Sequence, residues 1–453
     1  MVALLAAGAV VVPVAQSGSV AGAVACTSYC GGGEFHPVPF ARIIDTGARL
    51  NDVAPLGAKP IGPAAAAFDL TVLGRGAMPP TTVAPLAEVL TITVGGPTVS
   101  GTLAVWGAGD PAAQPSVNFV AHQTIATTVI VHASAAGRIR VQMRGATVGS
   151  ARIIVEQVGW YSSTGYDGSF TGGDPRGWRT IPVGNPTRVL DTRNGARADT
   201  PLGPHGDKIV TIRGVHAIAS TAIIVPNDAS VVGAVLSVTA LSATAPTHLT
   251  VLPTSPVGDP VAVNVYSGPR QIHSNLVIVP VGPDGKVHLV NLAGNTNVTV
   301  DVLAYLRTPG AETTRVGRVV PLAVPFRAFD TRQPAFGKVP LGPGQTEDWS
   351  FAAFVSSVKI GGTWVGKQVA LLGTLTNASL TRQYPTRPIG TGALTMYPST
   401  QPRPSATSLV SVEGAPTSSP VLVRYGTNQV ARVYNQSGYA HYLLDVGAVV
   451  LSD

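Results

Sequence analysis

Three short stretches place an arginine three residues before an Asp-Thr pair, and their side chains are the best suited to chemistry in this chain. A guanidinium binds carboxylate or phosphate through paired hydrogen bonds, so one hypothesis is a threefold ligand site. The alternative, which we favour, is structural: Asp-Thr forms an Asx turn, and the arginine caps carbonyls or pairs elsewhere. On a regular strand the two side chains point to opposite faces, so a direct pair requires a turn or bulge between them. The pairs are Arg42 and Asp45, Arg188 and Asp191, and Arg327 and Asp330.

A second candidate is aromatic. Trp106, Tyr266 and Tyr397 could stack against sugar rings as a platform. Such side chains more often fill the core or rim of a sandwich, and we favour that interpretation.

Motifs for catalysis and metal binding are missing from the sequence. It contains no Gly-x-Ser-x-Gly, no His-Glu-x-x-His and no EF-hand loop. We therefore predict a non-enzymatic protein with no catalytic residue, no metal and no cofactor.

The arginine–aspartate stretches belong to a longer repeat. A Pro-Leu-Gly follows each of them, and its leucine lies 11 residues after the aspartate every time: Leu56, Leu202 and Leu341. The pair Val117-Asn118 matches Val263-Asn264, and each copy closes on an alternating apolar strand. Each copy spans about 125 residues, which is long enough to bury its own core. A single unit has thus been repeated three times.

Composition indicates what kind of unit it is. Of 453 residues, 45% are hydrophobic and only 12% charged, with 51 glycines and 38 prolines. This excludes a disordered chain and a coiled coil. About seven short strands per copy, separated by turn signals and without a long helical period, predict an all-β fold: three tandem antiparallel β-sandwich (or barrel-like) modules.

The repeat sets the expected boundaries. Module 1 covers 37–161, module 2 covers 180–307 and module 3 covers 318–453. The linkers 162–179 and 308–317 are short enough for the modules to pack together, and we expect Trp178-Arg179 to fix that packing.

The first residues suggest export. An apolar run followed by Ala23-Val24-Ala25 predicts a signal peptide over 1–25, and a Cys-containing N-terminal segment covers 26–36. A disulfide between Cys26 and Cys30 would fit an exported protein, the alternative being two unpaired thiols. Beyond the leader, no apolar run reaches transmembrane length.

The charge balance is moderately basic. The formal net charge is +7, and 24 of the 30 basic residues are arginine. This suits loose attraction to an anionic wall polymer. The chain has no basic run interleaved with aromatic residues, so nucleic-acid binding is not expected.

The repeat also resembles a known group of modules. Arg188-Val189-Leu190-Asp191-Thr192-Arg193, together with Pro201-Leu202-Gly203 and the closing Val300-Asp301-Val302, resembles the hallmark of tandem β-modules in secreted proteins of actinobacteria and similar high-GC bacteria. Copy one departs from it with Gly47 in place of the second arginine, and copy three lacks the asparagine of Val-Asn. The resemblance implies an accessory or surface domain.

Together these features predict a non-enzymatic exported protein of the cell envelope, secreted or associated with the wall surface. It would act in surface structure, adhesion or assembly, with a cell-wall polymer, a glycan or other copies of itself as partner. The alternatives are a carbohydrate-binding module array and a coat or appendage subunit of a filament or virus-like particle.

Overall fold

The computed structural model describes residues 31–50, 54–193, 200–218, 220–337, 339–357, 359–360, 363–364, 366–381 and 391–452. The predicted signal peptide (1–25) and the Cys26–Cys30 disulfide lie outside these residues.

Module 2 shows the topology most simply. Its eight strands form two antiparallel sheets, ordered β10-β17-β12-β15 and β11-β16-β13-β14. Counted from one to eight along the chain, these orders are 1-8-3-6 and 2-7-4-5, the double Greek key of a jelly roll. The strands are β10 (Arg179–Asp191), β11 (Asp207–Thr211), β12 (Val231–Leu241), β13 (Thr247–Leu252), β14 (Val265–Ser267), β15 (Ile272–Pro280), β16 (Lys286–Asn291) and β17 (Asn297–Arg307).

Module 3 repeats this topology. Its sheets are β18-β27-β22-β25 and β19-β26-β23-β24. Its insertions are η3 (Pro334–Phe336), the helix α2 (Ala352–Ser357), the two-stranded β20 (Lys359–Ile360) and β21 (Thr363–Trp364), and η4 (Thr427–Gln429). The other strands are β18 (Val319–Asp330), β19 (Thr346–Ser350), β22 (Gln368–Thr381), β23 (Thr391–Pro398), β24 (Leu409–Val412), β25 (Thr417–Arg424), β26 (Val430–Asn435) and β27 (Tyr439–Leu451).

Module 1 has the same two sheets plus one connecting strand. β1, β9, β4 and β7 pair in the 1-8-3-6 order, and β3, β8, β5 and β6 in the 2-7-4-5 order. The extra β2 pairs with both β8 and β9 and joins the sheets into a nearly closed barrel. The elements are β1 (Phe35–Asp45), β2 (Lys59–Ile61), β3 (Phe68–Thr71), η1 (Thr81–Val83), β4 (Ala87–Gly95), β5 (Gly101–Gly107), β6 (Val117–Phe119), β7 (Ile125–His132), β8 (Arg138–Gly145) and β9 (Gly149–Tyr161).

The predicted fold class, all-β with three antiparallel sandwich modules, is confirmed. The apolar residues between each pair of sheets form a separate cluster in each module. Alternation along the strands explains this, because the side chains of one face of every strand point between its own two sheets. Each module therefore has its own hydrophobic core.

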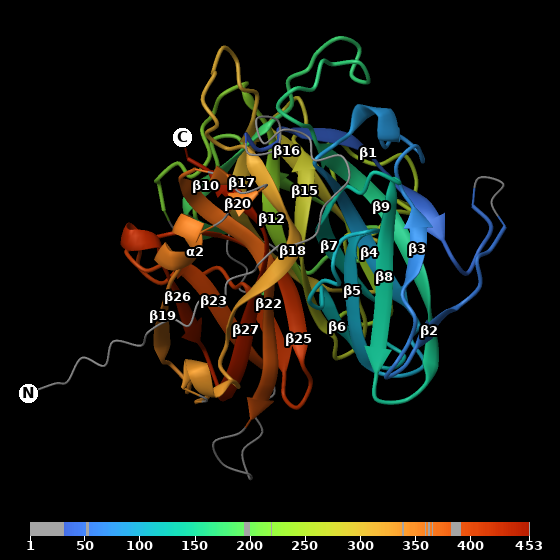
Figure 1. The fold of residues 1–453 in the computed structure, drawn as a ribbon. Helices are drawn as coiled ribbons and strands as arrows, with labels where there is room; N and C mark the ends of the chain where they lie inside the picture. The colour runs from blue at the N-terminus through green and yellow to red at the C-terminus, as the bar shows by residue number, and fades with distance from the viewer. Residues whose placement is uncertain are drawn as a thin grey trace, which may run out of the picture.

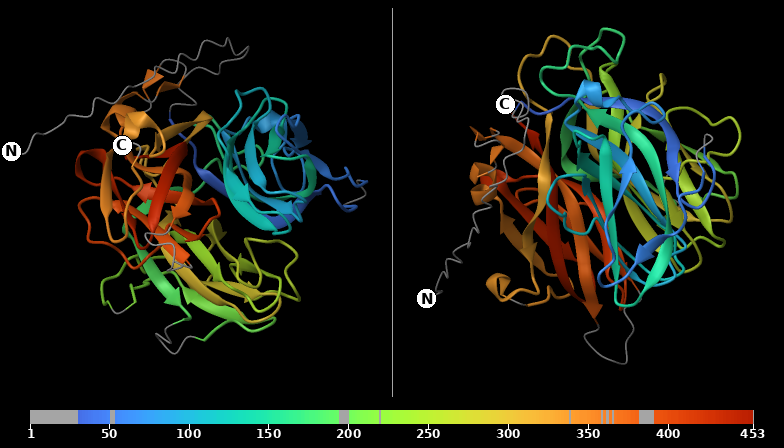
Figure 2. Two further views of the ribbon diagram at one scale, coloured as in Figure 1. Left: turned by 90° about the horizontal axis from the view of Figure 1, so that it is seen from below. Right: turned by 45° about the vertical axis from the view of Figure 1, so that its right-hand side comes forward.

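A fourth hydrophobic cluster belongs to all three modules at once. It comes from the 1-8-3-6 sheets, on the faces that point away from each module's own core. These faces meet around a common axis, and Figure 2 shows the three modules arranged around this centre. The cluster includes Val89 and Tyr161 of module 1, Leu276 of module 2, and Leu372 and Val450 of module 3. Because the 1-8-3-6 sheets meet at this axis, we call them the inner sheets, and we call the 2-7-4-5 sheets the outer sheets.

The start of each module closes one end of this axis. Phe35 and Trp178 exchange backbone hydrogen bonds, as do Gly33 and Val319, and the Thr180 N–H donates to Gly317. The rings of Phe35 and Trp178 also lie 6.2 Å apart within the fourth cluster. Segments far apart in the sequence thus lie side by side at the upper end of the molecule in Figure 1. Trp178 does tie the modules together at this point.

Among the described residues, no helix is both long enough and apolar enough to cross a membrane.

Candidate functional site

The repeated motif folds in the same way in all three modules. A register irregularity follows the arginine in β1, β10 and β18, and this bulge turns arginine and aspartate to one side. Arginine Nη1 lies 3.4, 3.2 and 3.1 Å from the aspartate Oδ2 in modules 1, 2 and 3. A direct pair therefore forms, by way of the bulge that a strand requires.

The Asp-Thr half of the motif shapes the turn that follows. The aspartate Oδ1 accepts the N–H of the residue two positions later, from Gly47, Arg193 and Arg332. The threonine hydroxyl accepts a backbone N–H of the closing strand, from Ile153, Val298 and Tyr442. These contacts are the Asx turn and the turn-to-strand lock of a structural motif.

A second acid completes each cluster. Arg188 binds Asp301 of β17 through Nε (2.7 Å) and Nη2 (3.0 Å), and Arg327 binds Asp445 of β27 in the same way (2.9 and 3.0 Å). In module 1, Arg42 reaches Glu156 of β9 at 3.3 Å. Each arginine thus lies between two carboxylates.

A second arginine balances the charge. Arg193 and Arg332 bind the motif aspartates of modules 2 and 3 through Nε and Nη2. Module 1 has Gly47 at this position, and Arg152 of β9 binds Asp45 instead. A Cβ on Gly47 would lie 2.7 Å from the Arg152 side chain, so the glycine leaves room for this replacement. The departure of copy one from the motif is therefore compensated.

The clusters lie at the contacts between modules and join them in cyclic order. Arg42 donates to the Val261 carbonyl of module 2 (3.0 Å), and Arg188 to the Thr407 hydroxyl of module 3 (3.1 Å). Arg327 donates to Gln114 of module 1 (3.2 Å). Each arginine reaches the loop between the fourth and fifth strand of the next module. Head-to-tail contacts that close after three steps describe a ring, here built from one chain.

The acids of the closing strands also reach this loop, with one exception. Glu156 accepts the Val263 N–H and Asp301 the Thr407 N–H, both at 3.0 Å. The next residue in each loop donates its backbone N–H to the fourth strand of its own module; these residues are Ser116, Asn264 and Ser408. The residue before Ser116, Pro115, therefore holds the position of Val263 and Thr407 and faces Asp445. Proline has no N–H to donate. A cavity of about 70 Å³, lined partly by Pro115 and Asp445, lies at this contact.

That equivalence corrects one landmark of the repeat. Asn264 corresponds in space to Ser116, because both donate a backbone N–H to the fourth strand. Asn118 corresponds to Tyr266, since they face Thr102 and His248 at the same register position. The match of Val117-Asn118 with Val263-Asn264 was therefore wrong by two residues.

The motif aspartates differ in pKa from Glu156 and Asp445 of the closing strands. Burial opposes ionisation of Asp45, Asp191 and Asp330, but hydrogen bonds from the second arginine hold the pKa of each below its usual value. Burial raises the pKa of Glu156 to about 7 and also raises that of Asp445, despite their arginine partners. The motif aspartates are thus the firmly charged members.

The three aromatic residues agree with the favoured interpretation, packing in the core or rim, rather than with a platform. Trp106 and Tyr397 are only 6% and 3% exposed and lie on strands of two different outer sheets. Tyr266 is half-buried at the contact with module 1, where burial raises its pKa and Glu156 adds to the shift. Only Tyr266 therefore joins a predicted arginine site.

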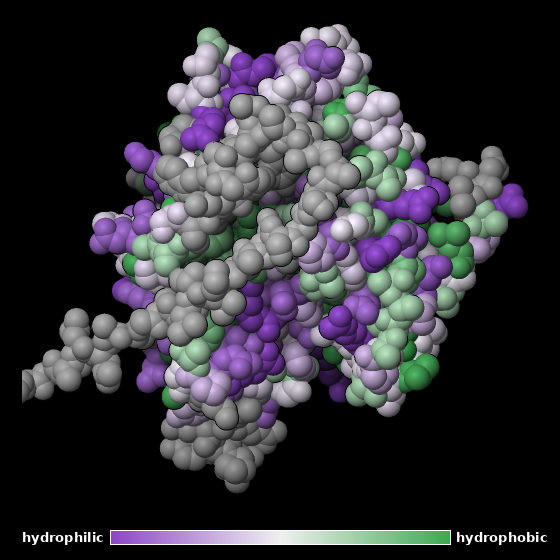
Figure 3. All heavy atoms as spheres, viewed as in Figure 1, coloured by the Kyte–Doolittle hydropathy of each residue, from purple (hydrophilic) through white to green (hydrophobic). Residues whose placement is uncertain are grey.

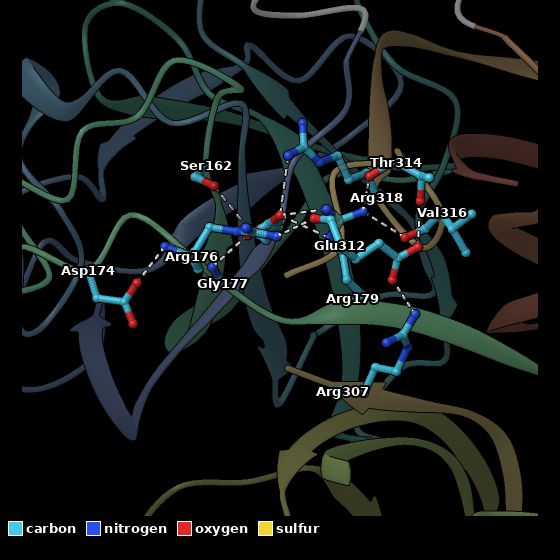
Figure 4. A network of polar contacts seen from close by, with 11 residues as sticks. Ser162, Asp174, Arg176, Gly177, Arg179, Arg307, Glu312, Thr314, Val316 and Arg318 are labelled. Atoms are coloured by element: carbon cyan, nitrogen blue, oxygen red, sulfur yellow. Dashed lines mark hydrogen bonds and ion pairs between the residues drawn. The ribbon is translucent and has the colours of Figure 1, made fainter. Parts of the chain in front are cut away.

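A further charged cluster lies at the end of the axis where the modules begin. Glu34 accepts hydrogen bonds from Arg179 Nε (2.9 Å), the Gly177 N–H (2.8 Å), Arg176 and Arg318 (both 3.3 Å). Figure 4 shows these arginines converging from different segments. Arg179 is fully buried and also donates to the carbonyls of Thr314 and Val316, both at 2.8 Å. Burial lowers its pKa, and Glu34 opposes that effect.

This cluster was missed by the sequence analysis, apart from Arg179. Its residues come from four assigned segments, the N-terminal segment, the two linkers and the start of module 3, and no motif links them. The available signal was Glu34, a single acid within a Gly-rich and aromatic stretch. A cavity of about 130 Å³ adjoins the cluster, and its lining includes Glu34, Arg176 and Arg318 together with Ser162, Ser163, Thr164 and Tyr166.

One buried acid has no counterpart in the other modules. Glu88 of β4 is fully buried, and neither carboxyl oxygen has a hydrogen-bond partner. The equivalent positions follow from the strand pairing, because Thr91, Ser237 and Thr374 each face the acid of the closing strand in their own module. Glu88 lies three residues before Thr91, and the residues three positions before Ser237 and Thr374 are Ala234 and Leu371. Burial raises the pKa of Glu88 to about 8. A core position of module 1 thus carries a protonated acid at neutral pH.

Within the described part of the chain, no three His, Cys, Asp or Glu side chains come together as a metal site.

Comparison with known proteins gives little. No protein-family model matches the chain, and no curated protein does. Among solved structures, one titled for the triple jelly roll fold and turret assembly in an archaeal virus is 9% identical, covers 93% of this chain and 91% of that chain, and has a TM-score of 0.18.

Two others are equally distant. The N-terminal CBM22-1-CBM22-2 tandem domain of Paenibacillus barcinonensis Xyn10C is 12% identical, covering 59% of this chain and 98% of that chain, with a TM-score of 0.16. A structure of Sulfolobus Turreted Icosahedral Virus is 9% identical, covering 92% and 91%, with a TM-score of 0.17. Scores this low carry no argument about function, so the assignment of three jelly rolls rests on strand order alone.

Proposed function

We propose that the chain is a non-enzymatic, exported surface protein, a block of three modules that acts in adhesion or assembly. One observation carries this proposal. The inner sheets of all three modules bury one another around the axis, so the three outer sheets lie on the sides of the block away from this axis. Each cluster of the repeated motif serves contacts between modules, which favours the structural interpretation of Arg42, Arg188 and Arg327 over a threefold ligand site.

The arginines on the outer sheet of module 1 favour an anionic binding partner. Alternate residues of β8 place Arg138, Arg140 and Arg144 on its outward face. Arg140 forms a bidentate pair with Asp69, whereas Arg144 contacts Gln142. Figure 3 shows a surface on which hydrophilic and hydrophobic residues mix. Attraction between such arginines and an anionic wall polymer or glycan would supply binding that weakens with salt.

Co-sedimentation with purified cell wall and with insoluble glycans tests this function. The protein should be retained on wall, and retention should fall as NaCl is raised. The double variant Arg138→Gln with Arg144→Gln should bind several-fold more weakly. A variant with the same charge loss elsewhere, Lys286→Gln with Arg424→Gln, should bind like the parent. Retention on neither wall, glycan nor sister subunits would contradict the proposal.

A coat or appendage subunit is the second candidate. Three equivalent outer sheets around one axis are suited to repeated contacts with further copies. Size-exclusion chromatography with negative-stain imaging distinguishes the two: polymers or shells of the purified protein favour the subunit, and a stable monomer that binds wall favours the surface protein.

A further inference from the structure

We propose that the cavity beside Glu34 binds one small oxyanion group: a phosphate, a sulfate or a carboxylate. The cavity lies where the N-terminal segment, the first linker and the start of module 3 meet, away from the outer sheets. Its volume of about 130 Å³ corresponds to roughly four water molecules. It therefore fits a small charged group rather than a length of polymer.

The first argument comes from counting hydrogen bonds at Glu34. A carboxylate offers about four acceptor sites. Arg179 Nε and the Gly177 N–H make the short contacts, at 2.9 and 2.8 Å, whereas Arg176 and Arg318 lie at 3.3 Å. The two arginines with the longer contacts line the cavity, and Arg176 Nη2 also donates to the Glu312 carbonyl at 3.0 Å. Glu34 alone does not satisfy them.

The second argument comes from donors that remain available. Arg318 Nε is buried and has no hydrogen-bond partner. A buried donor without a partner costs about 1–3 kcal/mol, so a small movement of Arg318 that brought Nε to an acceptor in the cavity would remove this penalty. Guanidinium forks match the oxygen geometry of phosphate and carboxylate. The Ser162 hydroxyl already donates to the Glu34 carbonyl (3.4 Å), and Ser163, which also lines the cavity, adds a second hydroxyl there.

The charge of the neighbourhood favours an anion over a cation. Arg176, Arg179, Arg307 and Arg318 face Glu34, Glu312 and Asp174, so four positive charges meet three negative ones. The oxygens of Glu34 already point at guanidinium groups, and a cation in the cavity would face Arg176 and Arg318. The surplus positive charge lies on the wall of the cavity.

Isothermal titration calorimetry on the full chain tests the site. Sulfate, inorganic phosphate and acetate are titrated separately, with ionic strength held constant by NaCl. Saturable binding at one site per chain is expected for at least one anion. Preference for sulfate and phosphate would assign a tetrahedral group, and preference for acetate a carboxylate. Absence of saturable binding by all three would overturn the proposal and leave a water-filled cavity.

Three variants locate the binding. Arg176→Met removes a lining charge from a partly exposed side chain, and Ser163→Phe fills the cavity without changing any charge. Each should weaken binding about tenfold or more, the loss of one charge-assisted hydrogen bond. Arg140→Met, which removes a similarly exposed arginine from module 1, should leave affinity within about twofold. Unchanged affinity in Ser163→Phe, with a thermal midpoint near that of the parent, would place the anion elsewhere and refute the site.

Discussion

The contact between modules 2 and 3 and the contact between modules 3 and 1 use the same motif but differ in how completely it is satisfied. Arg188 is 6% exposed, and Asp301 accepts both its guanidinium and the Thr407 N–H. Arg327 is 28% exposed, and Asp445 faces Pro115 and a cavity. The same motif therefore contributes different amounts to stability at the two contacts, because the neighbouring loop offers a backbone donor to Asp301 but not to Asp445.

The largest expected effect is loss of the buried arginine. Arg188→Met leaves Asp191 and Asp301 without their shared partner, and we expect a loss of about 3–5 kcal/mol in the free energy of unfolding. Arg327→Met should cost clearly less, because Arg327 is itself 28% exposed and a cavity already lies beside Asp445, although both carboxylates are buried. Denaturant unfolding of both variants measures the difference. An equal loss in the two would remove the distinction between the contacts.

The next effect extends the comparison to module 1, where Glu88 replaces the core residues Ala234 and Leu371. Its folded pKa of about 8 lies above the ordinary value of 4.5, so the folded state keeps a proton that the unfolded chain releases between these pH values. The contribution of Glu88 to stability should therefore be fully present below pH 4.5 and fall by up to about 1.4 kcal/mol per pH unit as pH rises toward 8.

Glu88→Leu should remove the part of this slope that comes from Glu88, leave the part that comes from Glu156 with its pKa of about 7, and stabilise the protein by about 3 kcal/mol at neutral pH. Unfolding curves between pH 5 and 8.5 measure it, with Leu371→Met as a control in the equivalent position of module 3. The same slope in the variant and the parent would show that Glu88 is not the titrating group.

A smaller gain should follow from giving Asp445 its missing donor. Pro115→Val introduces an N–H where the other contacts have Val263 and Thr407, and we expect a gain of about 1 kcal/mol from the new charge-assisted bond, reduced by the greater freedom of the unfolded chain. A double-mutant cycle with Asp445→Asn measures the coupling. A gain that persists undiminished in the Asn background would mean that the cavity, not the bond, is responsible.

The smallest effect is expected on the outer sheet. Arg140 and Asp69 form a well-aligned but solvent-exposed pair, and exposed pairs add little to stability. Arg140→Gln should leave the unfolding midpoint unchanged within error. A marked destabilisation would mean that the outer sheets, and not only the inner ones, hold the block together.

From the sequence it was possible to predict the repeat and the all-β class. It was also possible to predict that a direct Arg–Asp pair requires a turn or bulge between the two residues. Alternation and turn residues encode these features locally. The Pro-Leu-Gly landmark also has a local cause in modules 2 and 3, because Asn291 and Asn435 donate to the carbonyls of its leucine and glycine. Such features depend on residue type and spacing, which is why they could be inferred.

The contacts between modules could not be predicted in the same way. The partners of the three arginines are a Val261 carbonyl, a Thr407 hydroxyl and a Gln114 amide, which share a place in the fold but no residue type. The burial of Trp106 was favoured but could not be derived from its strand, for a related reason: the exposure of a side chain on the outer sheet depends on what packs over that sheet. The Glu34 cluster joins four segments that only the packing of modules brings together.

The cyclic order of the three modules within one polypeptide has an evolutionary consequence. In a ring of identical subunits, every substitution appears at all three contacts at once, so a mildly harmful change is tripled. Here each contact is encoded separately, so Pro115 changes one contact and Glu88 one core while the other two modules keep the arrangement that they share. Joining the three modules in one polypeptide thus lets each surface vary on its own, and it also holds the stoichiometry constant at any dilution.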